Sequence, residues 1–235
     1  MRIGFFGGSF DPPHLGHLAV ARAAAQAFLL DQVLFAPTAR QPLKPRGALA
    51  GFADRLAMVA LLCEAAASAE DPDPKTGSGE RGRRTIFEPS SLDAPRPDGS
   101  PNYTVDTLTR LRQERSPEDQ ILVIVGADAF LDLRRWRSPE ALLRLAEWIV
   151  VSRPGFSLRQ LDSLALSAEQ RARIHLLEQV HEPASATDIR ALLRHGADNS
   201  RAEPLLPACV REYIHTHHLY GVESGPASGP REHLP

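Results

Sequence analysis

The chain has 235 residues, 43% of them apolar, and a formal net charge of −2 at pH 7. The length fits one large α/β domain, the apolar share is sufficient for a core, and the near-neutral charge argues against sequence-independent binding of nucleic acid. No apolar run approaches the ~18 residues of a membrane span, and Met1-Arg2 leads into a strand without a secretory signal, so we expect a cytoplasmic protein without membrane contact.

Short apolar runs mark the predicted strands. The first run, Ile3 to Phe6, ends at Gly7-Gly8 and is typical of the buried strands of parallel sheets. The same criteria predict strands at residues 33–36, 85–87, 121–125, 148–151 and 174–177.

Helical periodicity separates these strands. It predicts helices at residues 17–30, 52–67, 104–114, 187–196 and 207–217, with Thr104 and Thr187 as N-caps. The stripes expected to be buried are Leu18, Ala21, Ala25, Phe28 and Leu29 in the first helix and Leu56, Val59, Ala60 and Cys63 in the second. Alternating strands and helices predict a Rossmann-like α/β fold with a doubly wound, mostly parallel sheet.

Two segments have almost no apolar residues to bury. Residues 68–84 are rich in Glu, Asp, Pro, Gly, Ser and Arg, and the chain after Gly221 is a polar tail. We therefore expect a single domain over residues 1–221, with a disordered insertion at about 68–84 and a flexible tail at 222–235.

The residues of greatest chemical interest follow the first strand, in the stretch GGSFDPPHLGH from Gly7 to His17. Ligands of doubly wound sheets bind at the carboxyl ends of the strands, and glycines let the backbone approach a ligand closely. His14 and His17 can share one helix face beside backbone N–H groups that favour anions. Such donors suit a phosphoryl group that gains charge in a transition state. The alternative, a tight turn with two incidental histidines, is much weaker.

This stretch resembles the HxGH signature of the nucleotidyltransferase superfamily, and the longer string is similar to the opening of the nicotinate-nucleotide adenylyltransferases. Trp136 and the segments 37–44, 102–108, 126–128, 185–190 and 213–220 also resemble that family in order and spacing. Leu43 stands where the family usually has His, and Asn102 where it has Ser. The resemblance covers nearly the whole chain apart from the two polar segments.

The resemblance implies transfer of AMP from ATP to nicotinate mononucleotide, which gives nicotinate adenine dinucleotide and pyrophosphate in NAD biosynthesis. The 5′-phosphate of the acceptor attacks the α-phosphorus of ATP directly, so the protein supplies positioning and charge stabilisation. ATP is the co-substrate. Mg²⁺ is the implied cofactor, held by phosphate oxygens rather than by a protein metal site.

The same resemblance implies roles for particular residues. The expected catalytic residues are His14, His17, Lys44 and Arg190. The expected ATP-binding residues are Gly7, Gly8, Ser9, Phe10, Gly16, Gly126, Asp128, Ser185 and Thr187. The expected acceptor-binding residues are Tyr103, Thr104, Trp136 and Arg153, with the pyridine ring stacked on Trp136.

Simpler structural roles compete with several of these assignments. Ser185 and Thr187 can be ordinary N-cap residues, and Asp128 can cap the helix that follows it. Trp136 can belong to the core, and Arg190 can lie on a solvated helix face.

Two other patterns are interpreted as structural. Residues 77–82 match GxGxxG, but no strand precedes them and no helix follows. His215, His217 and His218 lack a Cys or carboxylate at ligand spacing, so they are expected at a solvated helix end rather than around a metal.

Two rival functions are left open. One is the same transfer to another acceptor, such as nicotinamide mononucleotide or phosphopantetheine. The other is a nucleotide-sensing module without turnover, against which the intact His14, His17 and Arg190 argue. The sequence also leaves open whether the chain forms a homo-oligomer.

The composition of residues 69–84 generates a first test, because these residues bury too little apolar surface to offset the entropy of ordering them. Replacing them with a short Gly/Ser link should leave the unfolding transition and the activity nearly unchanged. Denaturant unfolding of the two proteins checks this. Loss of cooperative unfolding in the shortened protein would show that the segment is structural.

Overall fold

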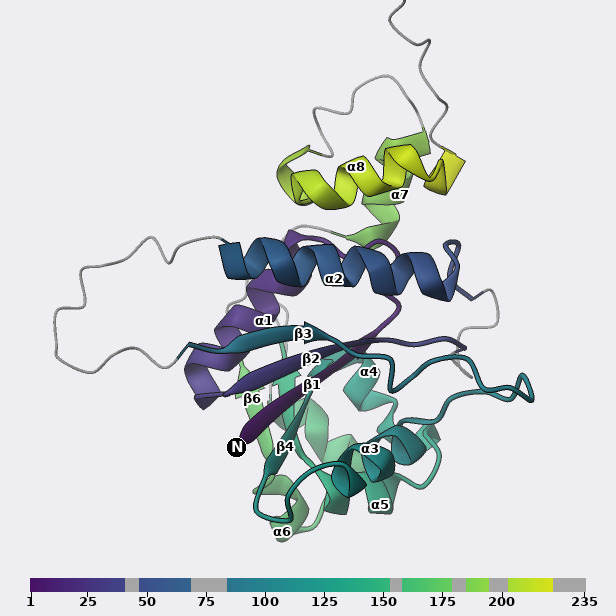
Figure 1. Cartoon of the computed structure of the whole chain (residues 1–235). Coiled ribbons are helices and arrows are strands. Elements are labelled where there is room, and N and C mark those ends of the chain that lie inside the picture. Colours follow the sequence, from purple (N-terminus) through teal and green to yellow (C-terminus); the bar gives the residue numbers. More distant parts are fainter. Residues whose placement is uncertain (41–46, 69–83, 153–157, 179–184, 195–202, 222–235) are drawn as a thin grey trace, which may run out of the picture.

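The computed structural model describes residues 1–40, 47–68, 84–152, 158–178, 185–194 and 203–221. Within these ranges six strands form one sheet in the order β3-β2-β1-β4-β5-β6 (Figure 1). The bounds are β1 Arg2–Gly8, β2 Gln32–Pro37, β3 Ile86–Pro89, β4 Gln120–Gly126, β5 Glu147–Val151 and β6 Ile174–Leu177. Every neighbouring pair is parallel, which confirms the predicted doubly wound α/β fold.

Helices cover both faces of the sheet. The bounds are α1 Leu15–Phe28, α2 Phe52–Ser68, α3 Thr104–Gln113, α4 Ala127–Leu131, α5 Pro139–Leu145, α6 Ala168–Arg171, α7 Ala186–Arg194 and α8 Ala208–Thr216. Short 3-10 helices are η1 Leu133–Arg135, η2 Leu158–Leu164, η4 Glu203–Leu205 and η5 Leu219–Gly221. Helices α1 and α2 pack on one face, with α7 and α8 beyond α2, and α3, α4 and α5 cover the other face (Figure 1).

The sheet separates two apolar cores because successive side chains of a strand point to opposite faces. Phe35 and Ile124 pack in the core under α1 and α2, whereas Leu34 and Val123 pack in the core under α3 and α5. The central residues of β4 are all buried, as expected for a strand covered on both faces.

Two of the predicted packing faces are partly wrong. Leu29 is 66% exposed because α1 ends at Phe28 and Leu29 is its C-cap in the left-handed conformation. In α2, Leu56 and Ala60 are only half-buried. The buried stripe of α2 is Arg55, Met58, Val59, Leu62, Cys63 and Ala66, and it therefore includes a charged residue.

The predicted helix caps are also corrected. Tyr103, rather than Thr104, is the N-cap of α3, and Thr187 is the second residue of α7 rather than its cap. Helical periodicity did not predict α4, α5 or α6, which have seven residues or fewer, although a helix after Asp128 was considered as an alternative. Such short helices hold too few residues for an apolar period to be recognised.

The predicted insertion begins and ends within the folded part of the chain. Ser68 is the last residue of α2, and a guanidinium nitrogen of Arg84 donates to the carbonyl oxygen of Ala67 at 2.8 Å. Residues 69–83, which include the GxGxxG match, and the tail at 222–235 lie outside the described residues.

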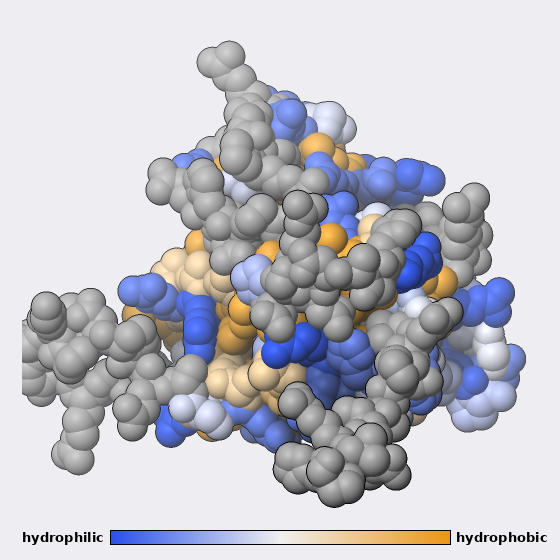
Figure 2. Space-filling view, turned by 90° about the horizontal axis from the view of Figure 1, so that it is seen from above, coloured by the Kyte–Doolittle hydropathy of each residue, from blue (hydrophilic) through white to orange (hydrophobic). Residues whose placement is uncertain are grey.

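Apolar and hydrophilic residues both contribute to the surface. Viewed from the side of α8, apolar and hydrophilic residues lie side by side, near the middle of the face as well as toward its edges (Figure 2). No helix among the described residues is both long enough and apolar enough to cross a membrane.

Candidate functional site

The strand order places the candidate site at the carboxyl ends of β1 and β4. These two strands are neighbours, but β1 leads to α1 on one face and β4 leads to α4 on the other. The two connections diverge, and a crevice at such a switch point is where doubly wound sheets bind ligands. At Gly126, the last residue of β4, an added Cβ would meet nothing within 4 Å. This side of the crevice is therefore open to a ligand.

The paired histidines lie where the chain enters α1. His14 is the N-cap residue, and the rings of His14 and His17 have centroids 3.7 Å apart. The backbone N–H of His14 donates to Nδ1 of His17 at 3.1 Å. Because Nδ1 accepts this bond, the proton of the neutral His17 ring is on Nε2, which is left as a donor.

Burial keeps both imidazoles neutral near pH 7. Desolvation lowers the pKa of His14 from 6.5 to about 4. Desolvation also lowers the pKa of His17 well below 6.5, and the proximity of His14 lowers it further. Two neutral rings in contact avoid the repulsion of two cations and still offer N–H donors to an anion.

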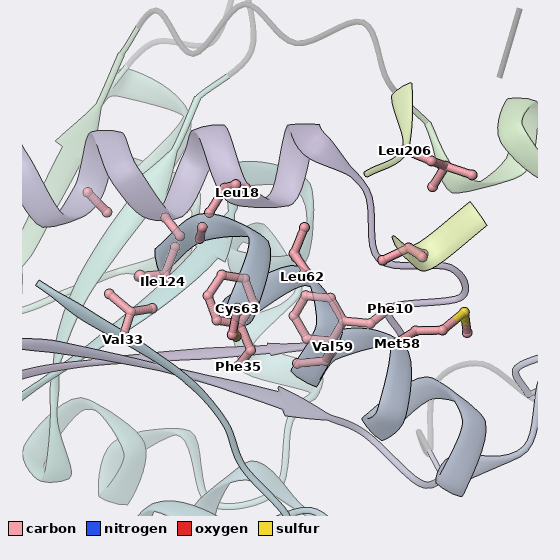
Figure 3. Packing of buried hydrophobic residues seen from close by; sticks show 14 of the residues in the cluster. Phe10, Leu18, Val33, Phe35, Met58, Val59, Leu62, Cys63, Ile124 and Leu206 are labelled. Carbon is pink, nitrogen blue, oxygen red and sulfur yellow. The ribbon is translucent and has the colours of Figure 1, made fainter. Parts of the chain in front are cut away.

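Phe10 joins this turn to the core. Its side chain is fully buried, and its backbone has a left-handed conformation with φ 48°. Its ring packs among Met58, Val59 and Phe35 (Figure 3), and its centroid lies 4.8 Å from that of His17. The side chain therefore packs against the His17 ring from the core, and only the backbone of Phe10 is left for a ligand.

The neighbouring glycines occupy tight positions. A Cβ on Gly8 would lie 3.3 Å from the ring of Phe10, and one on Gly7 would lie 3.2 Å from the ring of Phe5. Gly16 is buried at the start of α1. The small residues predicted for ATP binding thus also allow the first turn to pack closely.

Asp11 and Arg55, which the sequence analysis did not identify, hold the main chain of this turn. The Asp11 carboxylate accepts hydrogen bonds from the N–H groups of Leu49 (2.7 Å) and Ala50 (3.0 Å). In return, Arg55 donates to the carbonyl oxygens of Ala50 (3.1 Å) and Ser9 (2.6 Å). Both charged residues are at least 96% buried, and hydrogen bonds with backbone groups satisfy much of the polarity of each.

Helix α7 brings the second predicted group of phosphate ligands to the same place. Arg190 donates to the backbone carbonyl of Asp11 at 2.7 Å and to Oγ1 of Thr187 at 3.2 Å. Ser185 directly precedes the helix, and its carbonyl accepts from the N–H of Ile189 at 2.9 Å. The structure therefore brings together Arg190 and the histidine turn, which are far apart in the sequence.

Asp128 lies on the opposite side of the crevice. It is exposed and is the second residue of α4, whose N-cap is Gly126. The alternative interpretation of Asp128 as a helix cap is therefore wrong.

The predicted acceptor-binding residues come from two segments that meet. Tyr103 and Thr104 begin α3, and Trp136 follows η1. The guanidinium of Arg137 lies over the Tyr103 ring, 4.6 Å from its centroid, and connects the two segments. Trp136 is half-buried and packs edge-on against Trp148 at 6.1 Å, so it contributes to the core as well.

A buried carboxylate, Asp93, anchors the start of α3. Its side chain accepts from the hydroxyl of Thr107, and its backbone carbonyl accepts from the N–H of Ala39 at 3.1 Å. Burial raises the pKa of Asp93, and hydrogen bonds from Thr107 and Thr38 oppose that rise. Since the N–H of Thr38 donates to the carbonyl of Gly8 at 2.8 Å, α3 is connected to the end of β1.

Some predicted residues cannot be placed. Lys44 and Arg153 lie outside the described residues, as does Leu43. Across the described ranges, no group of three or more His, Cys, Asp or Glu side chains could hold a metal ion. His217 instead stacks on Tyr213, with ring centroids 3.8 Å apart.

Asp11, Arg55 and Tyr220 are site-shaping residues that local patterns did not reveal. The hydroxyl of Tyr220 donates to the Asp11 carboxylate at 2.9 Å across 209 residues of sequence. One available signal was Arg55, which interrupts the apolar stripe of α2. A charged residue at a core position of a helix indicates a buried polar partner.

The low pKa of His14 predicts acid sensitivity. The unfolded chain protonates this ring near pH 6.5 and the folded protein only near pH 4, so the folded state binds fewer protons between these values. The free energy of unfolding should therefore fall on acidification from pH 7.5 to 5, by about 2 kcal/mol for His14 alone. Denaturant unfolding at both pH values should show a smaller fall in His14→Gln than in the unsubstituted protein. The exposed His217→Gln is the control, and an equal fall in His14→Gln would contradict the assignment.

Comparison with known proteins agrees with this geometry. The family model described as cytidylyltransferase-like matches residues 5–192. A "Probable nicotinate-nucleotide adenylyltransferase" from Moorella thermoacetica is 38% identical, covering 93% of this chain and 91% of its own. One of the same name from Synechococcus is 39% identical, with coverages of 93% and 94%.

A solved structure has the same fold. It is the Plasmodium falciparum nicotinic acid mononucleotide adenylyltransferase complexed with NaAD, with a TM-score of 0.67 and 17% sequence identity over 94% of this chain and 98% of that chain. At 17% identity this structure shows the fold alone, whereas the sequence relatives at 38% and 39% identity show the family. The chain belongs to the cytidylyltransferase-like family and, within it, to the nicotinate-nucleotide adenylyltransferases.

Proposed function

We propose that the protein transfers the adenylyl group of ATP to nicotinate mononucleotide in the cytoplasm. An oxygen of the acceptor's 5′-phosphate forms a bond to the α-phosphorus of ATP while the bond to the bridging oxygen breaks, and pyrophosphate leaves. The products are nicotinate adenine dinucleotide and pyrophosphate. The named relatives support the reaction, and the geometry at the end of β1 supports its mechanism.

The observation that carries this proposal is the orientation of His17. The backbone holds its Nδ1, so the neutral ring offers Nε2–H as a donor before any ligand binds. A donor that needs no reorganisation is most effective where negative charge develops in the transition state. His17 is therefore the contact to the reacting phosphate, and His14 lies beside it.

The remaining ATP contacts follow from the surrounding elements. The N-terminus of α7, with Ser185, Thr187 and Arg190, binds the β- and γ-phosphates, because helix N-termini and guanidinium groups both favour phosphate. The backbone of the first turn approaches the triphosphate, and Asp128 accepts from a ribose hydroxyl. Lys44, which lies outside the described residues, is assigned to the phosphates by the family resemblance alone.

Mg²⁺ fits this arrangement as a partner of ATP. The Asp11 carboxylate, the buried acid nearest the histidines in sequence, already accepts three hydrogen bonds and is not a metal ligand. Phosphate oxygens are good ligands for Mg²⁺, which retains several waters in such sites. When bound, the ion would neutralise charge on the leaving pyrophosphate.

The acceptor binds on the side of α3. Tyr103, Thr104 and Trp136 contact the pyridine ring, and Arg153, which lies outside the described residues, is assigned to the acceptor by the family resemblance alone. Backbone N–H groups there suit a carboxylate, whereas the amide of the nicotinamide analogue presents only one oxygen and brings N–H groups of its own.

A pyrophosphate-release assay tests the proposal. ATP and Mg²⁺ are combined with nicotinate mononucleotide, nicotinamide mononucleotide or phosphopantetheine. Release that depends on nicotinate mononucleotide supports it. Binding of ATP without release for any acceptor would favour a nucleotide-sensing module instead.

The role of His17 predicts a large loss of turnover on substitution. His17→Ala should lower kcat by roughly 10²–10³-fold, as removal of one oxyanion-type donor does, with a much smaller change in ATP affinity. His17→Gln, which can place an N–H near the lost Nε2–H, should recover part of this loss. Steady-state kinetics and calorimetry with ATP make the comparison. Near-normal turnover in His17→Ala would remove this residue from the mechanism.

The acceptor pocket predicts a preference for the acid over the amide. One or two lost charge-assisted hydrogen bonds, each about 1.5–3 kcal/mol, give a kcat/KM ratio of roughly ten- to thousandfold. Arg137 is held against the ring of Tyr103, one of the proposed acceptor-binding residues. Its positive charge should add to the preference, so Arg137→Ala should reduce the ratio.

Arg135→Ala is the matched control for Arg137: both residues are exposed, but Arg135 pairs with Asp132 at 3.2 Å, whereas Arg137 lies over the Tyr103 ring. It should leave the ratio of the two kcat/KM values unchanged. Equal kcat/KM values for both mononucleotides in the unsubstituted protein would contradict nicotinate mononucleotide as the preferred acceptor. The proposal of adenylyl transfer itself would stand. An unchanged ratio in Arg137→Ala would exclude Arg137 from recognition of the carboxylate.

A further inference from the structure

A buried carboxylate lies three residues before His14. Asp11 is only 4% exposed. Its Oδ2 accepts from the N–H of Leu49 at 2.7 Å, and its Oδ1 accepts from the N–H of Ala50 at 3.0 Å and from the hydroxyl of Tyr220 at 2.9 Å. Three donors from two distant segments thus hold the residue that precedes the histidine pair.

Tyr220, near the C-terminal end of the described chain, contacts Asp11 across 209 residues of sequence. It lies in η5, is 8% exposed, and has a left-handed backbone conformation with φ 62°. That conformation is unfavourable for a residue other than glycine and persists only where surrounding contacts enforce it. Burial and the adjacent Asp11 raise the pKa of Tyr220, so its hydroxyl keeps its proton and remains a donor.

Asp11 also contacts the opposite side of the phosphate site. Its backbone carbonyl accepts from Nη1 of Arg190, whose Nη2 donates to Thr187 on the same helix. Asp11 therefore belongs to the histidine turn and also binds the guanidinium of Arg190 on α7. A displacement of Asp11 would move the two halves of the site relative to each other.

We propose that Asp11 and Tyr220 are positioning residues for the ATP phosphates, through which η5 sets the geometry of the histidine turn and of Arg190. The proposal rests on the proposed function of that turn. Neither residue touches the reacting atoms. Tyr220 donates to Asp11, and Asp11 places His14 and Arg190.

The contacts predict which kinetic constant responds. Loss of the Tyr220 hydroxyl leaves a buried carboxylate oxygen with one donor fewer, so the turn is held less tightly. The Kd and the KM for ATP should rise about tenfold in Tyr220→Phe, as expected for a weakened bond to a charged group. The KM for the mononucleotide acceptor should change less than about twofold, because its proposed pocket is at α3.

Tyr213→Phe is the matched control. Tyr213 also donates a phenolic hydroxyl to a carboxylate, Oδ1 of Asp54, at 3.1 Å, and it also belongs to the C-terminal helices. A general loss of stability would affect both variants, whereas an effect on ATP should appear only in Tyr220→Phe. Thermal unfolding reports the first property and calorimetry with ATP reports the second.

A double-mutant cycle tests the pathway. If Tyr220 acts through Asp11, adding Tyr220→Phe to Asp11→Asn should change ATP affinity by less than about twofold, so the two effects are not additive. Should Asp11→Asn fail to fold, the comparison of the two Tyr→Phe variants still decides. Equal ATP affinity in Tyr220→Phe and the unsubstituted protein, or an equal loss in Tyr213→Phe, overturns the proposal.

Calorimetry with ATP alone separates this proposal from the function on which it rests. It needs no acceptor and no turnover. If the unsubstituted protein binds ATP but does not use nicotinate mononucleotide, the acceptor is wrong while the tenfold difference at Tyr220 supports the positioning role. If the unsubstituted protein does not bind ATP, both proposals fail.

Discussion

The parallel pairing of β1 with β4 is the constraint on which the site depends. Arg2 to Phe6 lie beside Gln120 to Ile124 in register, so the two strands end close together. Their connections then leave for opposite faces of the sheet, and such a switch point is where doubly wound sheets bind ligands. The histidine turn follows one strand and Gly126 ends the other. A shift in the register of β1 against β4 would separate the histidine turn from Gly126.

Within that space, the chemistry depends on a ring whose direction is set by the backbone. His17 accepts from the N–H of His14, Phe10 packs against its ring, and burial keeps it uncharged. A neutral donor binds ground-state phosphate less strongly than an imidazolium would, yet its hydrogen bond strengthens as charge develops. The arrangement therefore favours the transition state over the bound substrate.

Apolar runs predicted the strands and periodicity predicted the long helices, because most of these elements bury a row of apolar side chains. Periodicity could not predict α4 and α5, which have only five and seven residues. It also misplaced part of the buried stripe of α2, because the charged Arg55 occupies a core position there. The histidine pair was predicted from a local motif. The bond between Asp11 and Tyr220 has no local signature, since it joins residues 209 positions apart, and only the folded arrangement of η5 shows it.

The buried charges show why precise placement is needed at this edge of the sheet. The cores on both faces are apolar, whereas Asp11 and Arg55 are buried beside the turn and bond mainly to backbone groups. A turn has few backbone bonds of its own, so Arg55 from α2 and Arg190 from α7 donate to carbonyl oxygens of the turn that a helix or sheet would pair internally. Burying these charges is costly unless each is fully satisfied, so any departure from this one geometry is penalised. That penalty makes the turn rigid, and rigidity is what a catalyst acting by position and charge requires.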